Sequence, residues 1–345
     1  MKSFLIDTFL HGLAGYYPKQ EPAVNVEMHG SGREKRRLTA LVNRIAGASP
    51  EGRKLLEHAA REGYALALEP MYYSGGTCDA GQRKIVLNSM LSDARLVGTL
   101  AHETRHAYQF SNGGQPTSYM SSRSLGTQIK ITRLQEADAC AFAAAVVEEM
   151  ERAGDPVPMK RMGEEKPGIT AAYRAAFSAE RPESRRNALK AAADAWYDDA
   201  EIRFLYEKDT AVLPLSRGKM LENTSGRFET LSSAEIAARI CRTDGGLYYD
   251  GADLEAPPRA GVHPRTAEWL KKHAESCRNE GAANIDPGLS RLPVYKSSAW
   301  LDRRLDETCL GAFPEPFDEE GRAKLLNAGK RKENPFRLKP ARAGR

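Results

Sequence analysis

The chain has 345 residues, of which 41% are hydrophobic and 28% are charged, so it can bury a core and is not a mainly disordered polypeptide. Its net charge of +5 is mild, and no run reaches the roughly 18 to 20 consecutive apolar residues of a membrane span. Five scattered cysteines without a CxxC pair argue against a disulfide framework and against a cysteine zinc knuckle, and they indicate a reduced, cytoplasmic protein.

Residues 1–35 are predicted to form an N-terminal helix followed by a loop. Phe4 and Phe9 share one face of an amphipathic helix, whereas Asp7 and His11 interrupt the apolar run that a signal peptide needs. The loop is predicted from its proline, glycine and charged residues.

The core domain is predicted to span residues 36–215. Apolar residues at helical spacing predict one or two helices over residues 34–69, and Ser49-Pro50-Glu51 has the residues of a helix start. After a turn at residues 74–76, the alternating pattern of residues 83–88 predicts a short strand.

Two further helices complete the predicted centre of this domain. The first follows Ser92-Asp93 and ends near Phe110, before a polar loop; the second covers residues 132–152. Gly154-Asp155-Pro156 then interrupts the chain, and alanine-rich residues 169–209 are again predicted to be helical.

The C-terminal part is predicted in two pieces. Residues 216–318 form a mostly helical extension packed on the core, and residues 319–345 form a basic, weakly ordered tail. We expect such a tail to be a solvated surface, which makes nucleic-acid contact unlikely as a main function.

The chemistry is concentrated in the first central helix, in the sequence His102-Glu103-Thr104-Arg105-His106. Histidines one helical turn apart lie on the same face, so both imidazoles can bind one zinc ion per chain. Zinc lowers the pKa of its bound water to about 7, and Glu103 is placed to act as the general base. The alternative is a chance spacing of two histidines, which this composition makes rare.

A catalytic zinc site needs a third protein ligand, and no histidine follows His106 before His263. Glu136, near the start of the second helix, is the favoured ligand, although a carboxylate there could instead complement the helix dipole. Cys140, one turn further on, is an alternative soft ligand or a small buried residue. Asp138 is predicted to accept a hydrogen bond from a ligand imidazole.

These motifs together resemble the glutamate zincins, a class of HExxH metallopeptidases. His102-Glu103-Thr104-Arg105-His106, followed by Glu136-Ala137-Asp138-Ala139, is similar to poorly characterised bacterial metallopeptidase domains. The resemblance implies an α+β zincin-like core in which the strand at residues 83–88 is a sheet edge. A peptide substrate would then lie along Ile85, Val86 and Leu87. One departure is Leu134, where some members carry a glutamate.

The sequence thus predicts a zinc peptidase acting on a peptide or protein substrate. The residue that stabilises the transition state stays open among Tyr173, Tyr197, Arg203 and His263. The alternative function is a catalytically silent or regulatory zinc-binding protein, with the basic tail contacting a partner or nucleic acid or directing export as an effector. The oligomeric state stays open.

Overall fold

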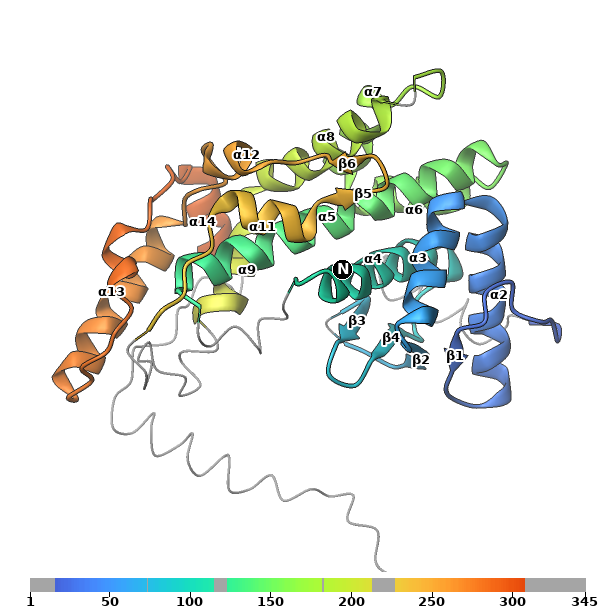
Figure 1. The fold of residues 1–345 in the computed structure, drawn as a ribbon, viewed down its shortest axis with the longest axis horizontal. Coiled ribbons are helices and arrows are strands. Elements are labelled where there is room, and N and C mark those ends of the chain that lie inside the picture. Colours follow the sequence, from blue (N-terminus) through green and yellow to red (C-terminus); the bar gives the residue numbers. More distant parts are fainter. Residues whose placement is uncertain (1–15, 73, 115–122, 182, 213–226, 308–345) are drawn as a thin grey trace, which may run out of the picture.

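The computed structural model describes residues 16–72, 74–114, 123–181, 183–212 and 227–307 (Figure 1). The predicted N-terminal helix and the predicted basic tail lie outside these residues. Within the described part the chain is an α+β protein, mostly helical with a small mixed sheet. None of its described helices combines the length and the apolar character that a membrane crossing requires.

The main sheet has four strands in the order β1-β2-β4-β3. Strand β2 is parallel to β1 and to β4, whereas β3 is antiparallel to β4. The strands are β1 (Glu27–Met28), β2 (Ala65–Glu69), β3 (Gly76–Asp79) and β4 (Lys84–Asn88).

The strand predicted at residues 83–88 is present as β4. The prediction that this strand forms the edge of the sheet is wrong. Hydrogen bonds join β4 to β2 on one side and to β3 on the other, so Ile85, Val86 and Leu87 have no open backbone edge for a peptide. All three side chains are buried, as expected for an interior strand covered on both faces. The edge on this side of the sheet is β3.

The N-terminal helices are α2 (Gly32–Ala48) and α3 (Pro50–Arg61). Ser31 and Glu34 form a capping box that starts α2 inside the predicted loop, and the predicted cap Ser49 accepts from the backbone N–H of Gly52. The predicted helix does not continue to residue 69. Gly63, at φ +75°, ends it, and β2 follows.

Two long helices run through the middle of the molecule, α4 (Asp93–Ser111) and α5 (Leu125–Arg152). They lie side by side in Figure 1, and α5 also contacts α6, α8 and α11. Because neighbours surround it, α5 is buried over most of its length, and small residues such as Ala139 and Ala143 permit the close packing. Helix α5 begins earlier than the predicted residue 132.

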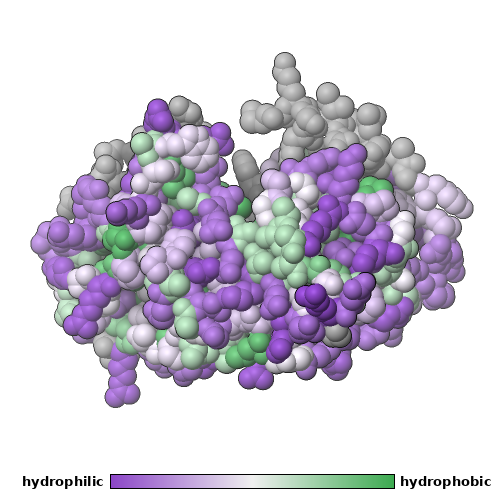
Figure 2. All heavy atoms as spheres, turned by 90° about the horizontal axis from the view of Figure 1, so that it is seen from above, coloured by the Kyte–Doolittle hydropathy of each residue, from purple (hydrophilic) through white to green (hydrophobic). Residues whose placement is uncertain are grey.

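Helices from the rest of the chain cover α5. One hydrophobic core joins side chains of the sheet, α2, α4, α5, α8 and α11, so residues 233–254 share the core of the N-terminal part. The face of the molecule in Figure 2 is mostly hydrophilic, and its strongly hydrophobic residues form small separate patches. The remaining elements are α6 (Val157–Glu165), α7 (Pro167–Ala176), α8 (Ser184–Asp198), α9 (Ala200–Glu207), η2 (Lys208–Val212), α11 (Ser233–Ile240), β5 (Arg242–Thr243), β6 (Gly246–Leu247), α12 (Gly251–Glu255), α13 (Pro264–Asn279), η3 (Pro287–Arg291) and α14 (Ala299–Glu307).

Candidate metal centre

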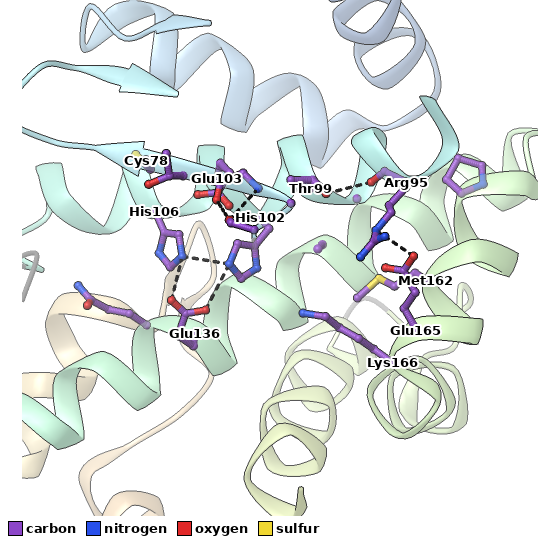
Figure 3. Close-up of a pocket in the computed structure, with 18 of the residues that line it drawn as sticks. Cys78, Arg95, Thr99, His102, Glu103, His106, Glu136, Met162, Glu165 and Lys166 are labelled. Carbon is purple, nitrogen blue, oxygen red and sulfur yellow. Dashed lines mark hydrogen bonds and ion pairs between the residues drawn. The ribbon is translucent and has the colours of Figure 1, made fainter. Parts of the chain in front are cut away.

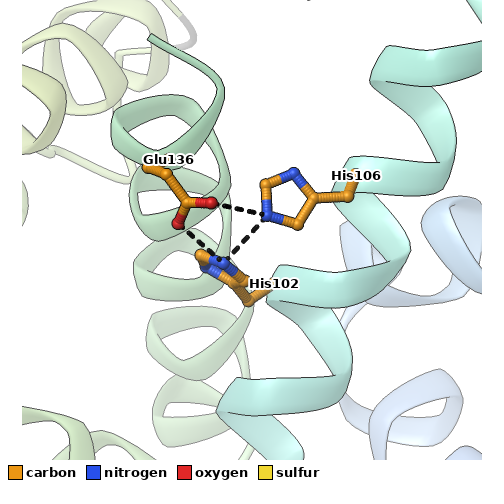
Figure 4. Close-up of side chains that lie close together, drawn as sticks. All are labelled: His102, His106 and Glu136. Carbon is orange, nitrogen blue, oxygen red and sulfur yellow. Dashed lines mark hydrogen bonds and ion pairs between the residues drawn. The ribbon is translucent and has the colours of Figure 1, made fainter. Parts of the chain in front are cut away.

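Helix α4 presents His102 and His106 on one face. The two residues are one turn apart, and their Nε2 atoms lie 3.1 Å from each other. Helix α5 brings Glu136 to the same point (Figure 4). One carboxylate oxygen of Glu136 lies 3.4 Å from Nε2 of His102, and the other lies 3.4 Å from Nε2 of His106.

This cluster has the donor atoms and the spacing of a zinc site. Zinc–nitrogen and zinc–oxygen bonds of about 2.0 to 2.2 Å in a tetrahedron put ligand atoms roughly 3.3 to 3.5 Å apart. The distances of 3.1 and 3.4 Å between the three side chains are close to that spacing. Two imidazoles and one carboxylate therefore fit a zinc ion and leave a fourth position for another ligand.

The side chains of the cluster shift one another's pKa values. Burial lowers the pKa of His102, but Cys140 and Glu136 raise it more, to about 10. Burial also lowers the pKa of His106, which Glu136 raises above its ordinary value. Burial raises the pKa of Glu136, yet the two histidines hold it well below the usual range. The carboxylate is thus poised to stay ionised beside the metal position.

Glu103 lies beside the cluster, between α4 and strand β3. Its side chain is buried, and burial raises its pKa above the ordinary value, against the lowering effect of His102 and His106. Strand β3 approaches so closely that a Cβ atom on Gly76 would lie 3.0 Å from Cγ and 3.1 Å from Oε1 of Glu103. Glycine at this position therefore allows the sheet edge to reach the glutamate.

A glutamine that the sequence interpretation missed orients His106. Nδ1 of His106 lies 2.8 Å from Oε1 of Gln109, one turn further along α4. The Gln109 amide nitrogen donates to the backbone oxygen of Gln135 and to Asp138, so the amide oxygen must face the imidazole and accept a hydrogen bond from its Nδ1–H. This leaves Nε2 of His106 facing Glu136 and the metal position.

The prediction that Asp138 contacts a ligand imidazole is wrong. Its carboxylate instead accepts from Arg105, Gln109 and Tyr248, and it is fully buried. The reason is helical geometry, since residues two apart on a helix point to different sides. Asp138 acts on His106 only through Gln109.

Cys140 lies against the nitrogen of His102 that faces away from Glu136. Its Sγ is 3.7 Å from Nδ1 of His102 and accepts from Nζ of Lys166 at 2.9 Å. Burial raises the pKa of this thiol, but Lys166 and His102 lower it more, to about 7. The alternative of Cys140 as a zinc ligand therefore finds no support in its position, which is behind the ligand imidazole.

The four residues left open for the transition state do not line the cavity that contains the cluster: Tyr173, Tyr197, Arg203 and His263. Tyr206 of α9, which the sequence interpretation did not single out, does line this cavity. Its hydroxyl donates to Glu136 at 2.7 Å. Only the tertiary structure brings Tyr206 to α5, so the sequence held no local signal for it.

The cavity has a volume of about 540 Å³ and lies between β3, α4, α5 and α6. His102, Glu103, His106 and Glu136 line it, and Figure 3 shows the four gathered at one end, with residues of α6 toward the other. The cavity thus combines three side chains that could hold a metal ion with a buried carboxylate, which are the groups that metal-assisted hydrolysis uses.

Comparisons with known proteins agree with this chemistry. Over residues 19–250 the chain matches the family described as "Putative metallopeptidase family (DUF6782)". No curated protein and no solved structure matches the chain. The matched region spans well over half of the sequence and contains every residue of the cluster, and the chain therefore belongs to this family.

Proposed function

We propose that the protein is a zinc-dependent peptidase in which His102, His106 and Glu136 hold one zinc ion and Glu103 is the general base. The observation that carries the proposal is the convergence of three ligand atoms from two helices, beside a buried glutamate, in an open cavity. A structural zinc site would need neither the glutamate nor the cavity, which favours an enzyme over a catalytically silent zinc-binding protein.

Zinc bound to these ligands would act as a Lewis acid toward a peptide carbonyl and would supply hydroxide near neutral pH. Glu103 would take the proton from the attacking water and pass it to the leaving amine. The Tyr206 hydroxyl, which donates to Glu136 at the edge of the cluster, would donate to the developing oxyanion. The metal ligands, the general base and the oxyanion donor would thus come from three neighbouring helices, α4, α5 and α9.

Strand β3 is the proposed docking edge for the substrate, in place of the interior strand β4. A Cβ atom on Gly76 would lie 3.0 Å from Cγ of Glu103, and Thr77 and Cys78 line the cavity. An extended peptide added to this edge would place its backbone beside Glu103. The order of an antiparallel edge strand, an HExxH helix and a second ligand helix supports the zincin-like core that the sequence resemblance implied.

Metal analysis joined to a peptidase assay tests this proposal. Wild-type protein should contain about one zinc ion per chain, and His106→Ala and Glu136→Ala should lose most of it, since two remaining ligands bind weakly. Glu103→Gln should keep zinc and lose hydrolysis of a mixed peptide substrate. His29→Ala is a matched control, because His29 also pairs with a glutamate, Glu27, but outside the cavity.

Two results would contradict the proposal. A wild-type protein that binds no zinc from a zinc-replete medium would remove the metal site. Turnover by Glu103→Gln equal to that of the wild type would remove Glu103 from the mechanism.

A further inference from the structure

Each of the two histidines of the cluster has a second ring nitrogen, which faces away from Glu136. For His106 this nitrogen, Nδ1, lies beside the amide of Gln109. For His102 it lies beside the sulfur of Cys140, with Sγ 3.7 Å from Nδ1. Of the residues that the structure describes, Cys140 is the one that forms a hydrogen bond with this nitrogen. The sulfur therefore occupies for His102 the place that the Gln109 amide occupies for His106.

The direction of this hydrogen bond follows from the metal position. Nε2 of His102 lies 3.4 Å from the Glu136 carboxylate and 3.1 Å from Nε2 of His106, so it is the nitrogen that would bind the metal. A histidine that binds a metal through Nε2 carries its proton on Nδ1, and that N–H group needs an acceptor. Sulfur is a larger and weaker acceptor than oxygen, which is consistent with the distance of 3.7 Å.

A lysine holds the sulfur from a second side. Nζ of Lys166 lies 2.9 Å from Sγ of Cys140. A lysine ammonium group has three N–H donors and no acceptor, so the sulfur must accept this hydrogen bond as well. A charged donor makes the bond stronger than one between neutral groups. The sulfur thus accepts from both Lys166 and His102, and its position is fixed between them.

The position of Lys166 is set by the junction of two helices. Helix α6 ends at this residue and α7 begins directly after it, at Pro167. The proline disfavours a helical backbone at Lys166, whose N–H donates to the backbone oxygen of Met162 at 2.7 Å. Helix α6 packs on both α4 and α5, and the lysine side chain lines the cavity (Figure 3). The α6–α7 junction therefore contacts the cluster through one side chain.

We propose that Cys140 and Lys166 are positioning residues for His102 as a zinc ligand. The sulfur accepts the Nδ1–H hydrogen bond and sets the orientation of the imidazole, and Lys166 holds the sulfur in place. The inference rests on the metal site of the proposed function and adds two residues outside the ligand set. It also makes zinc affinity depend on the α6–α7 junction, which belongs to neither ligand helix.

Zinc affinity, measured by competition with a zinc-binding chromophore, tests the role of the sulfur. Cys140→Ala should bind zinc about 10- to 100-fold more weakly, because the imidazole loses its acceptor. Cys140→Ser should recover part of this loss, since a hydroxyl is again an acceptor. Cys277→Ala is the matched control. It removes a sulfur that also lies 3.7 Å from an imidazole nitrogen, that of His273, but outside the cavity, so zinc affinity should not change.

A double-mutant cycle tests whether Lys166 acts through the sulfur. Lys166→Met keeps the length of the side chain and removes its N–H groups, so it should weaken zinc binding in the wild-type background. In the Cys140→Ala background it should cost nothing further, whereas independent effects on the fold would add. Lys190→Met is the control, because Lys190 pairs with Asp253 between α8 and α12, outside the cavity.

Spectroscopy tests the hydrogen bond directly. In zinc-loaded protein with 15N-labelled histidine, the Nδ1–H proton of His102 should exchange slowly with water, and Cys140→Ala should speed this exchange at least about tenfold. The Nδ1–H proton of His106, which donates to Gln109, is an internal reference and should not change. Cobalt-substituted protein should show no sulfur-to-cobalt charge-transfer band. Such a band, lost in Cys140→Ala, would make Cys140 a ligand and overturn the positioning role.

The results separate this inference from the peptidase function. Equal zinc affinity of Cys140→Ala and wild-type protein, or additive losses in the double mutant, overturns the positioning role and leaves the metal site standing. Zinc binding without cleavage of any peptide contradicts the peptidase function, whereas the zinc affinities still decide the positioning role. A wild-type protein that binds no zinc contradicts both. Circular dichroism verifies that each variant is folded.

Discussion

The side chain of Gln109 accepts a hydrogen bond from Nδ1 of His106 at 2.8 Å, so a neutral amide fixes the orientation of a proposed zinc ligand. The amide is itself fixed, because its nitrogen donates to Asp138 at 2.6 Å. Asp138 in turn pairs with Arg105 through two hydrogen bonds of 2.6 and 3.0 Å. Arg105, a variable position of the HExxH motif, therefore anchors α4 to α5 behind the metal position.

Replacing Gln109 by Met should weaken zinc binding about 10- to 100-fold, since Nδ1 of His106 loses its acceptor and the imidazole can rotate. The side chain stays similar in size, so packing changes little. Competition with a zinc-binding chromophore measures the affinity. Gln128→Met is the matched control, because Gln128 bonds only to the backbone oxygen of Arg123 and lies outside the cavity. Equal zinc affinity in Gln109→Met would contradict the orienting role.

Replacing Tyr206 by Phe should lower kcat about 10²- to 10³-fold and leave zinc content and KM nearly unchanged, because an oxyanion donor acts in the transition state. Steady-state kinetics on one peptide separate kcat from KM. Tyr249→Phe removes a comparable hydrogen bond, to Asp194 at 3.0 Å, and should cost only stability. A wild-type kcat in Tyr206→Phe would contradict the oxyanion role and would leave the hydroxyl only the role of positioning Glu136.

Replacing Gly76 by Ala should reduce kcat/KM by at least tenfold while zinc binding persists. The added methyl group would lie 2.8 Å from Cγ2 of Thr99 and 3.0 Å from Cγ of Glu103, so either strand β3 or the glutamate must move. Peptidase kinetics and zinc analysis provide the two measurements. Gly168→Ala, in α7 where nothing lies within 4 Å of the added methyl group and where φ is not positive, is the matched control. Unchanged kinetics in Gly76→Ala would show that β3 does not constrain the base.

The sequence predicted that the three side chains of the candidate metal centre lie together, because their geometry is mostly local. His102 and His106 share a helix face by spacing alone, and Glu136 needed only a second helix packed alongside. Helix spacing also explains the two neighbouring residues. Asp138 lies two positions after Glu136 and therefore points to another side of α5, whereas Cys140 lies four positions after Glu136 and therefore faces α4.

The predictions that were wrong or missing concern contacts between segments that are distant in the sequence. Alternation identified β4 as a strand, but it could not show that β2 and β3 pair on both sides of it. The burial of Val86 together with its neighbours is the local sign of an interior strand. Tyr206 lies 70 residues after Glu136 and reaches it only through the packing of α9 on α5, which no local pattern encodes.

Zinc binding should release protons and should become tighter as the pH rises. In the metal-free protein the pKa of His102 is raised to about 10, so at neutral pH this imidazole carries a proton that the metal must displace, and the pKa of His106 is raised as well. The same shift stabilises the metal-free fold below about pH 6.5, and this contribution is lost as the pH rises toward 10.

Calorimetric titrations with zinc between pH 6 and 9, in buffers of different protonation enthalpy, count the protons released. Glu136→Gln removes the carboxylate that raises both imidazole pKa values, so this variant should release fewer protons while it also binds zinc more weakly. An observed enthalpy that is independent of buffer, with a zinc affinity that is constant over this range, would show that the imidazoles are already neutral. The His102–Glu136 and His106–Glu136 contacts would then be ordinary hydrogen bonds rather than the ion pairs that zinc must displace.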